Sequence, residues 1–272
     1  MLKDRRKISI STCFDYNISF DKQVELISKA GFSHFSLGSY INHSRYLSKE
    51  GRLKIKELLD TYQLQIDSIH GPQIGSMGTS IQGFKDIIFA AQDLSIPVIV
   101  IHGSLFEIQQ EEFSENLDFL LENCTILEPI LKATGVTFAF ENLLPGLATD
   151  LMECALKELD PKHFGFCYDS SHDQIGGPRN SNLIEKFKDR LFAVHLSDRI
   201  KDFEDHAIPG EGFIQWDETI RQLKNSSFNS PVLLELMMKY SRVKEVPLFL
   251  ESAYKEGCLI YDKIFSDSSS KR

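Results

Sequence analysis

Residues 137–141 of the chain read Thr-Phe-Ala-Phe-Glu, a short, mostly apolar run that ends in a carboxylate. Runs of this length and composition, bounded by polar residues, are typical of buried strands. Seven similar runs are spread over the chain, with room for a helix between most of them. The predicted strands are Ile8–Thr12, His34–Leu37, Gln65–His70, Val98–His102, Thr137–Glu141, Phe164–Asp169, Leu191–Leu196 and Pro231–Leu236.

Amphipathic stretches with helical spacing lie between these runs. Ser48 precedes one of them and Gly135 ends another, as expected of helix caps. Strands that alternate with helices, without a break in composition, predict the α/β class and a parallel sheet. Eight such units close a barrel. We therefore predict one (β/α)8 TIM barrel over residues 1–265, followed by a polar tail at 266–272. The predicted helices include Phe20–Ala30, Leu53–Tyr62, Phe113–Thr134, Trp216–Asn225 and Val246–Phe265.

An open, doubly wound sheet is the alternative architecture. Such sheets usually carry a glycine-rich turn after the first strand. Here the turn reads Thr12-Cys13-Phe14-Asp15, which favours the barrel.

The composition restricts the partners. A net charge of -9 argues against nucleic acid, whose binding proteins usually present a basic face. Met1–Lys7 is charged and no signal-peptide core follows it, and no apolar run approaches the roughly 20 residues that span a bilayer. The five cysteines are widely spaced and odd in number, which indicates reduced thiols. These features predict a cytoplasmic protein without a membrane partner.

Six consecutive predicted strands carry a side chain that can bind a metal, at or near their carboxyl ends. In a (β/α)8 barrel these ends converge on one mouth, where active sites are built. Acidic side chains are seldom buried unless they are paired or hold a cation, so the pattern predicts a divalent metal site. The side chains are His70, His102, Glu141, Asp169 with His172 three residues later, His195 and Glu235.

Taken singly, these residues have simpler interpretations. His70 could be a satisfied core histidine, Glu141 could pair with a buried cation, and Glu235 could point outward between helices. Six coincidences at one end of successive strands are hard to explain by packing alone, so the joint pattern favours the metal site.

Several short motifs now fit a known family. The chain resembles the xylose-isomerase-like barrel superfamily, which includes sugar and sugar-phosphate isomerases and epimerases and also endonuclease IV. The order and spacing of the motifs cover roughly residues 8–260. They are Phe140-Glu141-Asn142, Tyr168-Asp169-Ser170-Ser171-His172, Val194-His195-Leu196-Ser197-Asp198, residues 206–212 (His-Ala-Ile-Pro-Gly-Glu-Gly) and Leu233-Leu234-Glu235.

The resemblance implies a site. Its single-metal form implies that Glu141, Asp169, His195 and Glu235 bind the metal and that His172 touches a substrate oxygen. His70, His102 and His206 are further candidates for substrate binding. In the endonuclease branch, two further zinc ions would instead be bound by His70, His102, His172 and His206. The chain departs from that branch at Glu204, where the branch has aspartate, and at Asp198-Arg199-Ile200.

The resemblance also implies the chemistry. Three carboxylates and one imidazole suit Mn²⁺, Mg²⁺ or Co²⁺, and additional histidines would favour Zn²⁺. The metal would polarise a sugar carbonyl and stabilise an enediolate. Glu141 and Glu235 would be the catalytic acid and base, giving epimerisation across two faces or isomerisation between neighbouring carbons. Arg199 is a candidate for an anionic substrate group or a solvated loop charge. Asp198 would orient His195 or contact substrate.

The predicted function is thus a metal-dependent isomerase or epimerase of a small sugar or sugar phosphate. One alternative is an endonuclease IV-like zinc phosphodiesterase that acts at abasic sites in DNA. Others are a lyase or dehydratase on the same scaffold and a non-catalytic sugar-binding relative. Phe113–Thr134 and the C-terminal helix are candidate surfaces for a homo-oligomer.

Overall fold

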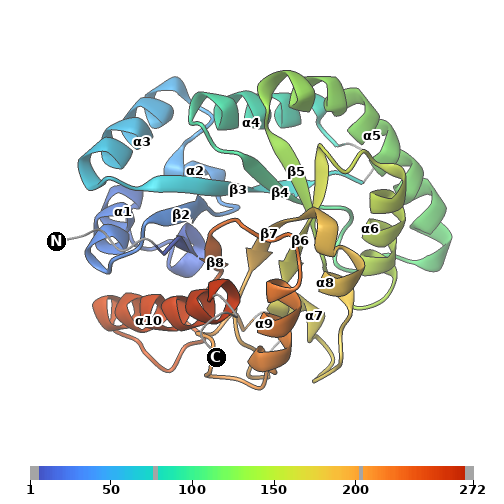
Figure 1. Cartoon of the computed structure of the whole chain (residues 1–272). Helices are drawn as coiled ribbons and strands as arrows, with labels where there is room; N and C mark the ends of the chain where they lie inside the picture. Colours follow the sequence, from blue (N-terminus) through green and yellow to red (C-terminus); the bar gives the residue numbers. More distant parts are fainter. Residues whose placement is uncertain (1–5, 76–78, 202–204, 267–272) are drawn as a thin grey trace.

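Eight parallel strands form one sheet that curves into a nearly closed barrel, as the sequence predicts (Figure 1). The computed structural model describes residues 6–75, 79–201 and 205–266. Neighbouring strands follow chain order from β1 to β7, and β8 pairs with β1. The strands are β1 (Ile8–Ser11), β2 (His34–Leu37), β3 (Gln65–Gln73), β4 (Val98–His102), β5 (Thr137–Glu141), β6 (Phe164–Asp169), β7 (Leu191–His195) and β8 (Val232–Leu234).

The ring closes between β7 and β8 through a short contact. Leu196, directly after β7, forms an isolated parallel bridge with Leu234 of β8. The amide of Leu196 donates to the carbonyl of Leu233 at 2.9 Å, and the amide of Glu235 donates to the carbonyl of Leu196 at 3.2 Å. Strands β7 and β8 are therefore shorter than predicted, and the backbone of Glu235 is fixed against the end of β7.

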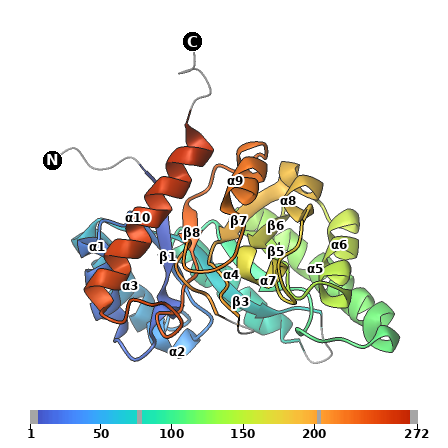
Figure 2. The ribbon, with the colours of Figure 1, turned by 90° about the horizontal axis from the view of Figure 1, so that it is seen from below.

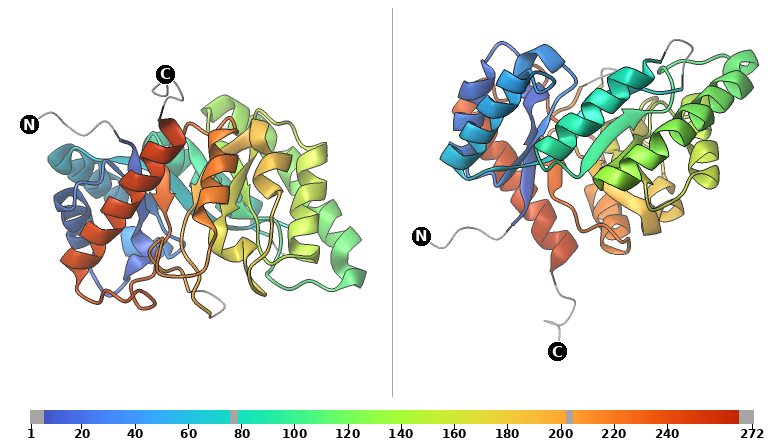
Figure 3. Two further views of the ribbon diagram at one scale, coloured as in Figure 1. Left: turned by 60° about the horizontal axis from the view of Figure 1, so that its bottom comes forward. Right: turned by 90° about the horizontal axis from the view of Figure 1, so that it is seen from above.

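Helices connect the strands and surround the barrel (Figures 1 and 3). Ser48 caps α3 by accepting from the amide of Gly51 at 2.9 Å, and Gly135 ends α5 with a φ of 75°. Both predicted caps are confirmed. The helices are α1 (Phe20–Lys29), α2 (Ile41–Ser44), α3 (Lys49–Tyr62), α4 (Ile81–Asp93), α5 (Phe113–Thr134), α6 (Leu147–Glu158), α7 (Ser170–Asp173), α8 (Leu183–Lys186), α9 (Trp216–Lys224) and α10 (Val246–Phe265).

Apolar side chains form two layers. The larger layer fills the space between strands and helices, and a small separate cluster lies on the other face of the sheet, inside the barrel. Because side chains alternate along a strand, a residue two positions after a member of the inner cluster also points inward. The inner cluster consists of Val98, Val100, Ala139, Cys167 and Ala193.

This alternation places the predicted site residues above the inner cluster. Glu141 follows Ala139 by two positions, and Asp169 and His195 bear the same relation to Cys167 and Ala193. Strand register then sets neighbours side by side: His102 of β4 pairs with Glu141 of β5. The side chains of the inner cluster thus lie below the polar side chains, which occupy the mouth of the barrel.

Helix α10 completes the wall beside β1 and β8 (Figure 2). Ser266 follows it, and residues 267–272 of the predicted polar tail lie outside the described residues. Among the described helices, none combines the length and apolar character that crossing a bilayer requires.

Candidate functional site

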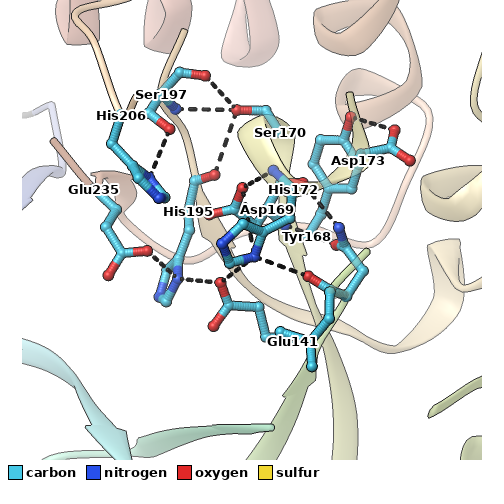
Figure 4. Close-up of polar contacts among 12 residues, drawn as sticks. Glu141, Tyr168, Asp169, Ser170, His172, Asp173, His195, Ser197, His206 and Glu235 are labelled. Carbon is cyan, nitrogen blue, oxygen red and sulfur yellow. Dashed lines mark hydrogen bonds and ion pairs between the residues drawn. The ribbon is translucent and has the colours of Figure 1, made fainter. Parts of the chain in front are cut away.

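Glu141 is the centre of the site (Figure 4). Its side chain is fully buried at the end of β5, and its two oxygen atoms face four histidines. Oε2 lies 3.2 Å from Nε2 of His102 and 3.4 Å from Nε2 of His70. Oε1 lies 3.1 Å from Nδ1 of His195 and 3.3 Å from Nδ1 of His172. Side chains from three strands, β3, β4 and β7, and from helix α7 therefore meet at one carboxylate.

Glu235 reaches the same group from another strand. Its Oε2 lies 2.8 Å from Nδ1 of His195, the nitrogen that also faces Glu141 (Figure 4). The side chain is almost completely buried and lies one position after β8. Glu235 therefore points into the barrel mouth and not outward between helices.

The two carboxylate oxygens of Asp169 differ in their contacts. Oδ1 accepts a 2.7 Å hydrogen bond from the amide of His172, which makes Asp169 the N-cap of α7. Asn142 fixes the Asp169 backbone by donating to its carbonyl at 2.9 Å and accepting from its amide at 2.8 Å. Oδ2 is buried, and no hydrogen-bond partner reaches it among the residues described. A buried carboxylate oxygen of this kind suits a cation.

Three histidines are oriented by bonds from their Nδ1 atoms, one of them His172, whose Nδ1 lies 3.1 Å from the carbonyl of Asn142. Nδ1 of His70 lies 3.0 Å from the carbonyl of Gly71, and Nδ1 of His206 lies 3.1 Å from Oγ of Ser197. Such bonds fix the ring and leave the other nitrogen available, as is common for metal-binding histidines. For His70 the other nitrogen is the one that faces Glu141.

The donors form three overlapping groups, and within each the candidate ligand atoms lie within 4.8 Å of one another. Glu141, Asp169 and Glu235 each belong to two groups and so join them into one cluster. The four ligands implied by the family resemblance are divided among these groups, because Asp169 and His195 do not share one. The groups are His70, Glu141, His195 and Glu235; Glu141, Asp169 and His172; and Asp169, His206 and Glu235.

The two glutamates are ionised at neutral pH in this arrangement. Burial alone would raise the pKa of Glu141, but the facing histidines, His195 foremost, hold it well below its ordinary value. Burial would also raise the pKa of Glu235, but the neighbouring His195 outweighs it and lowers that pKa to about 2. Burial prevails for Asp169, whose pKa is raised. The cluster therefore contains carboxylates with distinct proton affinities.

The imidazoles carry the compensating charge. Burial lowers the pKa of His195, but Cys167, Glu235 and Glu141 outweigh it and raise that pKa well above the ordinary value. Burial is likewise outweighed at His172, where Asp169 and Glu141 raise the pKa to about 10. A divalent cation could take over the role of these positive charges. The fit between the donors and a cation is thus both chemical and electrostatic.

A cavity of about 320 Å³ opens onto the cluster. Tyr16, in the loop after β1, lines it. Phe106, which the sequence did not reveal, lies in the loop after β4, and its ring centroid is 5.7 Å from that of His102 and 5.3 Å from that of His172. The lining residues are Cys13, Tyr16, Ser39, His70, Gly71, Pro72, Gln73, His102, Phe106, His172, His206, Glu235 and Met237.

Two candidates on the loop after β7 lie elsewhere. Arg199 is not among the described residues that line this cavity; its buried side chain has Nη1 3.9 Å from Oδ1 of Asp205. Asp198 is predicted to orient His195 or contact substrate, but its carboxylate bonds to three amides of its own loop and to the indole of Trp216 at the start of α9. Glu204 lies outside the described residues.

Asp198 ties this loop together. Its carboxylate accepts from the amides of Arg199 at 2.8 Å, Gly210 at 2.7 Å and Ile214 at 3.1 Å, and from the indole of Trp216 at 2.9 Å. Because the loop also carries His206, these bonds fix the backbone from which that histidine enters the cluster.

Known proteins share this architecture. The family model described as "Xylose isomerase-like TIM barrel" matches residues 24–258. An inosose isomerase of Bacillus velezensis is 22% identical over 240 residues, covering 81% of this chain and 84% of that protein. A structure titled as the IOLI protein with a bound zinc atom has a TM-score of 0.73 at 20% identity, covering 96% of this chain and 100% of the other. The 3-keto-D-glucoside 4-epimerase YcjR of E. coli has a TM-score of 0.71 at 15% identity, with coverages of 93% and 99%.

Proposed function

The chain belongs to the xylose isomerase-like TIM barrel family, and from this premise we propose that it is a metal-dependent isomerase or epimerase of a small sugar or sugar phosphate. The observation that carries the proposal is the approach of Glu141 and Glu235 to one nitrogen of His195, at 3.1 Å and 2.8 Å, beside a cavity. Two similar proteins, an inosose isomerase and a 3-keto-D-glucoside 4-epimerase, support the same class of reaction.

The metal would be held by Glu141, Asp169, His195 and Glu235. The feature that fits it best is Oδ2 of Asp169, which is buried and has no hydrogen-bond partner within the described part of the chain. When bound, a divalent cation supplies Lewis-acid polarisation of the substrate carbonyl. The three carboxylates favour Mn²⁺, Mg²⁺ or Co²⁺, whereas the nearby imidazoles and the zinc-containing IOLI structure keep Zn²⁺ as an alternative.

The glutamates would move the proton. Both are ionised at neutral pH, so either can accept a proton from the carbon next to the carbonyl. For epimerisation, the other glutamate would take a proton from solvent water and give it to the carbon, and the first would then release its proton to solvent, so that no net proton is consumed. Return to the opposite face gives the epimer, and return to the neighbouring carbon gives the isomer. His172, His70, His102 and His206 line the cavity and would bind substrate hydroxyls.

Solvent exchange tests this proposal directly. The metal-loaded chain is incubated in D₂O with a panel of ketoses, aldoses and their phosphates, and NMR follows deuterium entering the carbon next to the carbonyl. We expect exchange with one member of the panel, its loss in Glu141→Gln and Glu235→Gln, and its retention in Glu251→Gln, an exposed control on α10. Absence of exchange and of product across the panel would refute the proposal.

A zinc phosphodiesterase is the second candidate, because the four further histidines that it would use as zinc ligands all line the cavity. About three zinc ions per chain, together with nicking of abasic DNA, would favour it. A dehydratase would reveal itself in the sugar panel by a product lacking one water. In that enzyme the further zinc ligands would be His70, His102, His172 and His206.

Two further predictions accompany the function. Cytoplasmic location can be checked by fractionation of the native cell. A homo-oligomer through α5 or α10 can be checked by sedimentation of the purified chain.

A further inference from the structure

A second cavity, of about 350 Å³, adjoins the first on the side of β8 and β1. Cys13, Tyr16 and Met237 line both cavities, so these three side chains lie at their boundary. The first cavity is by itself large enough for a small molecule, since such sites usually measure about 300–1,000 Å³. The proposed proton transfer makes no use of the second, which leaves it for a part of the substrate remote from the reacting carbon.

The boundary is held by hydrogen bonds between loops. The amide of Met237 donates to the carbonyl of His206 at 2.8 Å, and the amide of Met238 donates to the carbonyl of Phe14 at 3.1 Å. These bonds join the loop after β8 to the loops after β7 and β1. The second cavity is therefore built on the same backbone frame that presents His206 to the cluster.

Two lysines give the second cavity its charge. Lys239 and Lys244 both line it, and Nζ of Lys244 donates to the carbonyl of Lys239 at 2.6 Å. Nζ of Lys239 lies 4.7 Å from the centroid of the Tyr240 ring. Among the residues that the structure describes, no ion pair joins either ammonium to a carboxylate. Asp15 is the acidic member of the lining, and its Oδ1 already accepts from the amide and side chain of Asn17.

We propose that this cavity is a subsite for the phosphate of a sugar phosphate whose carbonyl end occupies the first cavity. The proposal rests on the proposed function and specifies its substrate class. A phosphate carries close to two negative charges and three acceptor oxygens, which two ammonium groups on flexible stems can meet. Cys13, Tyr16 and Met237 would then flank the carbon chain between the carbonyl and the phosphate.

Paired substrates test the subsite. For the active sugar of the panel, KM and kcat are measured with the free sugar, its terminal phosphate ester and the corresponding sugar acid. The variants are Lys239→Gln, Lys244→Gln and the double change, with Lys255→Gln on the exposed face of α10 as control. We expect each lysine change to raise KM for the phosphate ester roughly tenfold, the worth of about one charge-assisted hydrogen bond. KM for the free sugar should stay within about twofold in every variant.

Failure of the subsite differs from failure of the function. Turnover of free and phosphorylated sugar with equal KM would overturn the subsite and leave the proposed function standing. A preference for the sugar acid over the phosphate ester would also overturn it. If no sugar is turned over, the function fails, and calorimetry with a sugar phosphate decides the subsite. Saturable binding that the double variant loses would support it, and absence of binding to the unaltered chain would overturn it.

Discussion

Loading the site with a divalent cation should release protons, and their number should report which histidines bind it. The pKa of His195 is raised well above its ordinary value and that of His172 to about 10, because the carboxylate contacts outweigh burial. Both rings are therefore protonated at pH 7. A protonated imidazole nitrogen has no lone pair to offer, so a ring that binds through it must first lose its proton.

The two ligand sets give different numbers. With Glu141, Asp169, His195 and Glu235 as ligands, only His195 loses a proton, and the apparent affinity should rise about tenfold per pH unit between pH 6 and 8. If His172 also binds, two protons leave, and the apparent affinity should rise about a hundredfold per pH unit. For His172, the difference between about 10 and the ordinary 6.5 corresponds to roughly 5 kcal/mol that the cation must outweigh. A cost of the same kind applies to His195. Because the proposed ligand set contains His195 and not His172, the single-proton result is expected.

Calorimetry measures both quantities. Mn²⁺ and Zn²⁺ are titrated into chelator-stripped protein in buffers of different ionisation enthalpy, and the dependence of the observed heat on that enthalpy counts the protons. His34→Gln, at a histidine of β2 that is outside the cavity and, among the described residues, outside every group of side chains that could hold a metal, should leave the count unchanged. Affinity that stays constant from pH 6 to 8, with no proton released, would refute the charge balance inferred for His195.

Three further changes test other parts of the molecule. Burial raises the pKa of Asp67 to about 6, so ionisation of this carboxyl group opposes folding at higher pH. Asp67→Asn should therefore increase the free energy of urea unfolding by roughly 1–3 kcal/mol at pH 8, and this gain should disappear below pH 4. Asp198→Asn should shift the emission of Trp216, the only tryptophan, to longer wavelength, because the asparagine cannot satisfy all four donors; unchanged emission would contradict this role. A Cβ at position 165 would lie 2.2 Å from the Phe192 ring, so Gly165→Ala should cost about 1–3 kcal/mol, and Phe192→Leu should restore part of the loss.

The fold could be predicted because long elements leave a period in the sequence. Helices α5 and α10 have the bounds that their apolar spacing indicates. Helices α2, α7 and α8, of four residues each, are too short to show a period. The predicted strand Pro231–Leu236 is longer than β8, since its far end is joined to Leu196 by single hydrogen bonds in place of a ladder.

The site could be predicted to the extent that its residues lie on strands. Glu141 points into the barrel because it follows Ala139 by two positions, and such a relation can be inferred once the strands are known. Loops have no comparable period. Asp198 and Trp216 are 18 positions apart, and their contact depends on the whole path of the loop between them. For the same reason, no sequence pattern predicted that Phe106 lines the cavity.

Asp169 shows why a ligand set inferred from a family does not by itself give the geometry. Register places it beside His195, which would favour a shared cation. A one-turn helix begins at the next residue, however, and its N-terminus needs an acceptor three positions before the amide of His172. One carboxylate oxygen of Asp169 is committed to that cap, so only Oδ2 is left for the cluster. The same aspartate thus orients His172 and offers an oxygen to a cation. Asparagine can keep the cap but removes the negative charge, so Asp169→Asn should weaken metal binding in the calorimetric titration and lower the pKa of His172 from about 10 in an NMR titration of the metal-free chain. An unchanged metal affinity would contradict the role of Asp169 as a ligand.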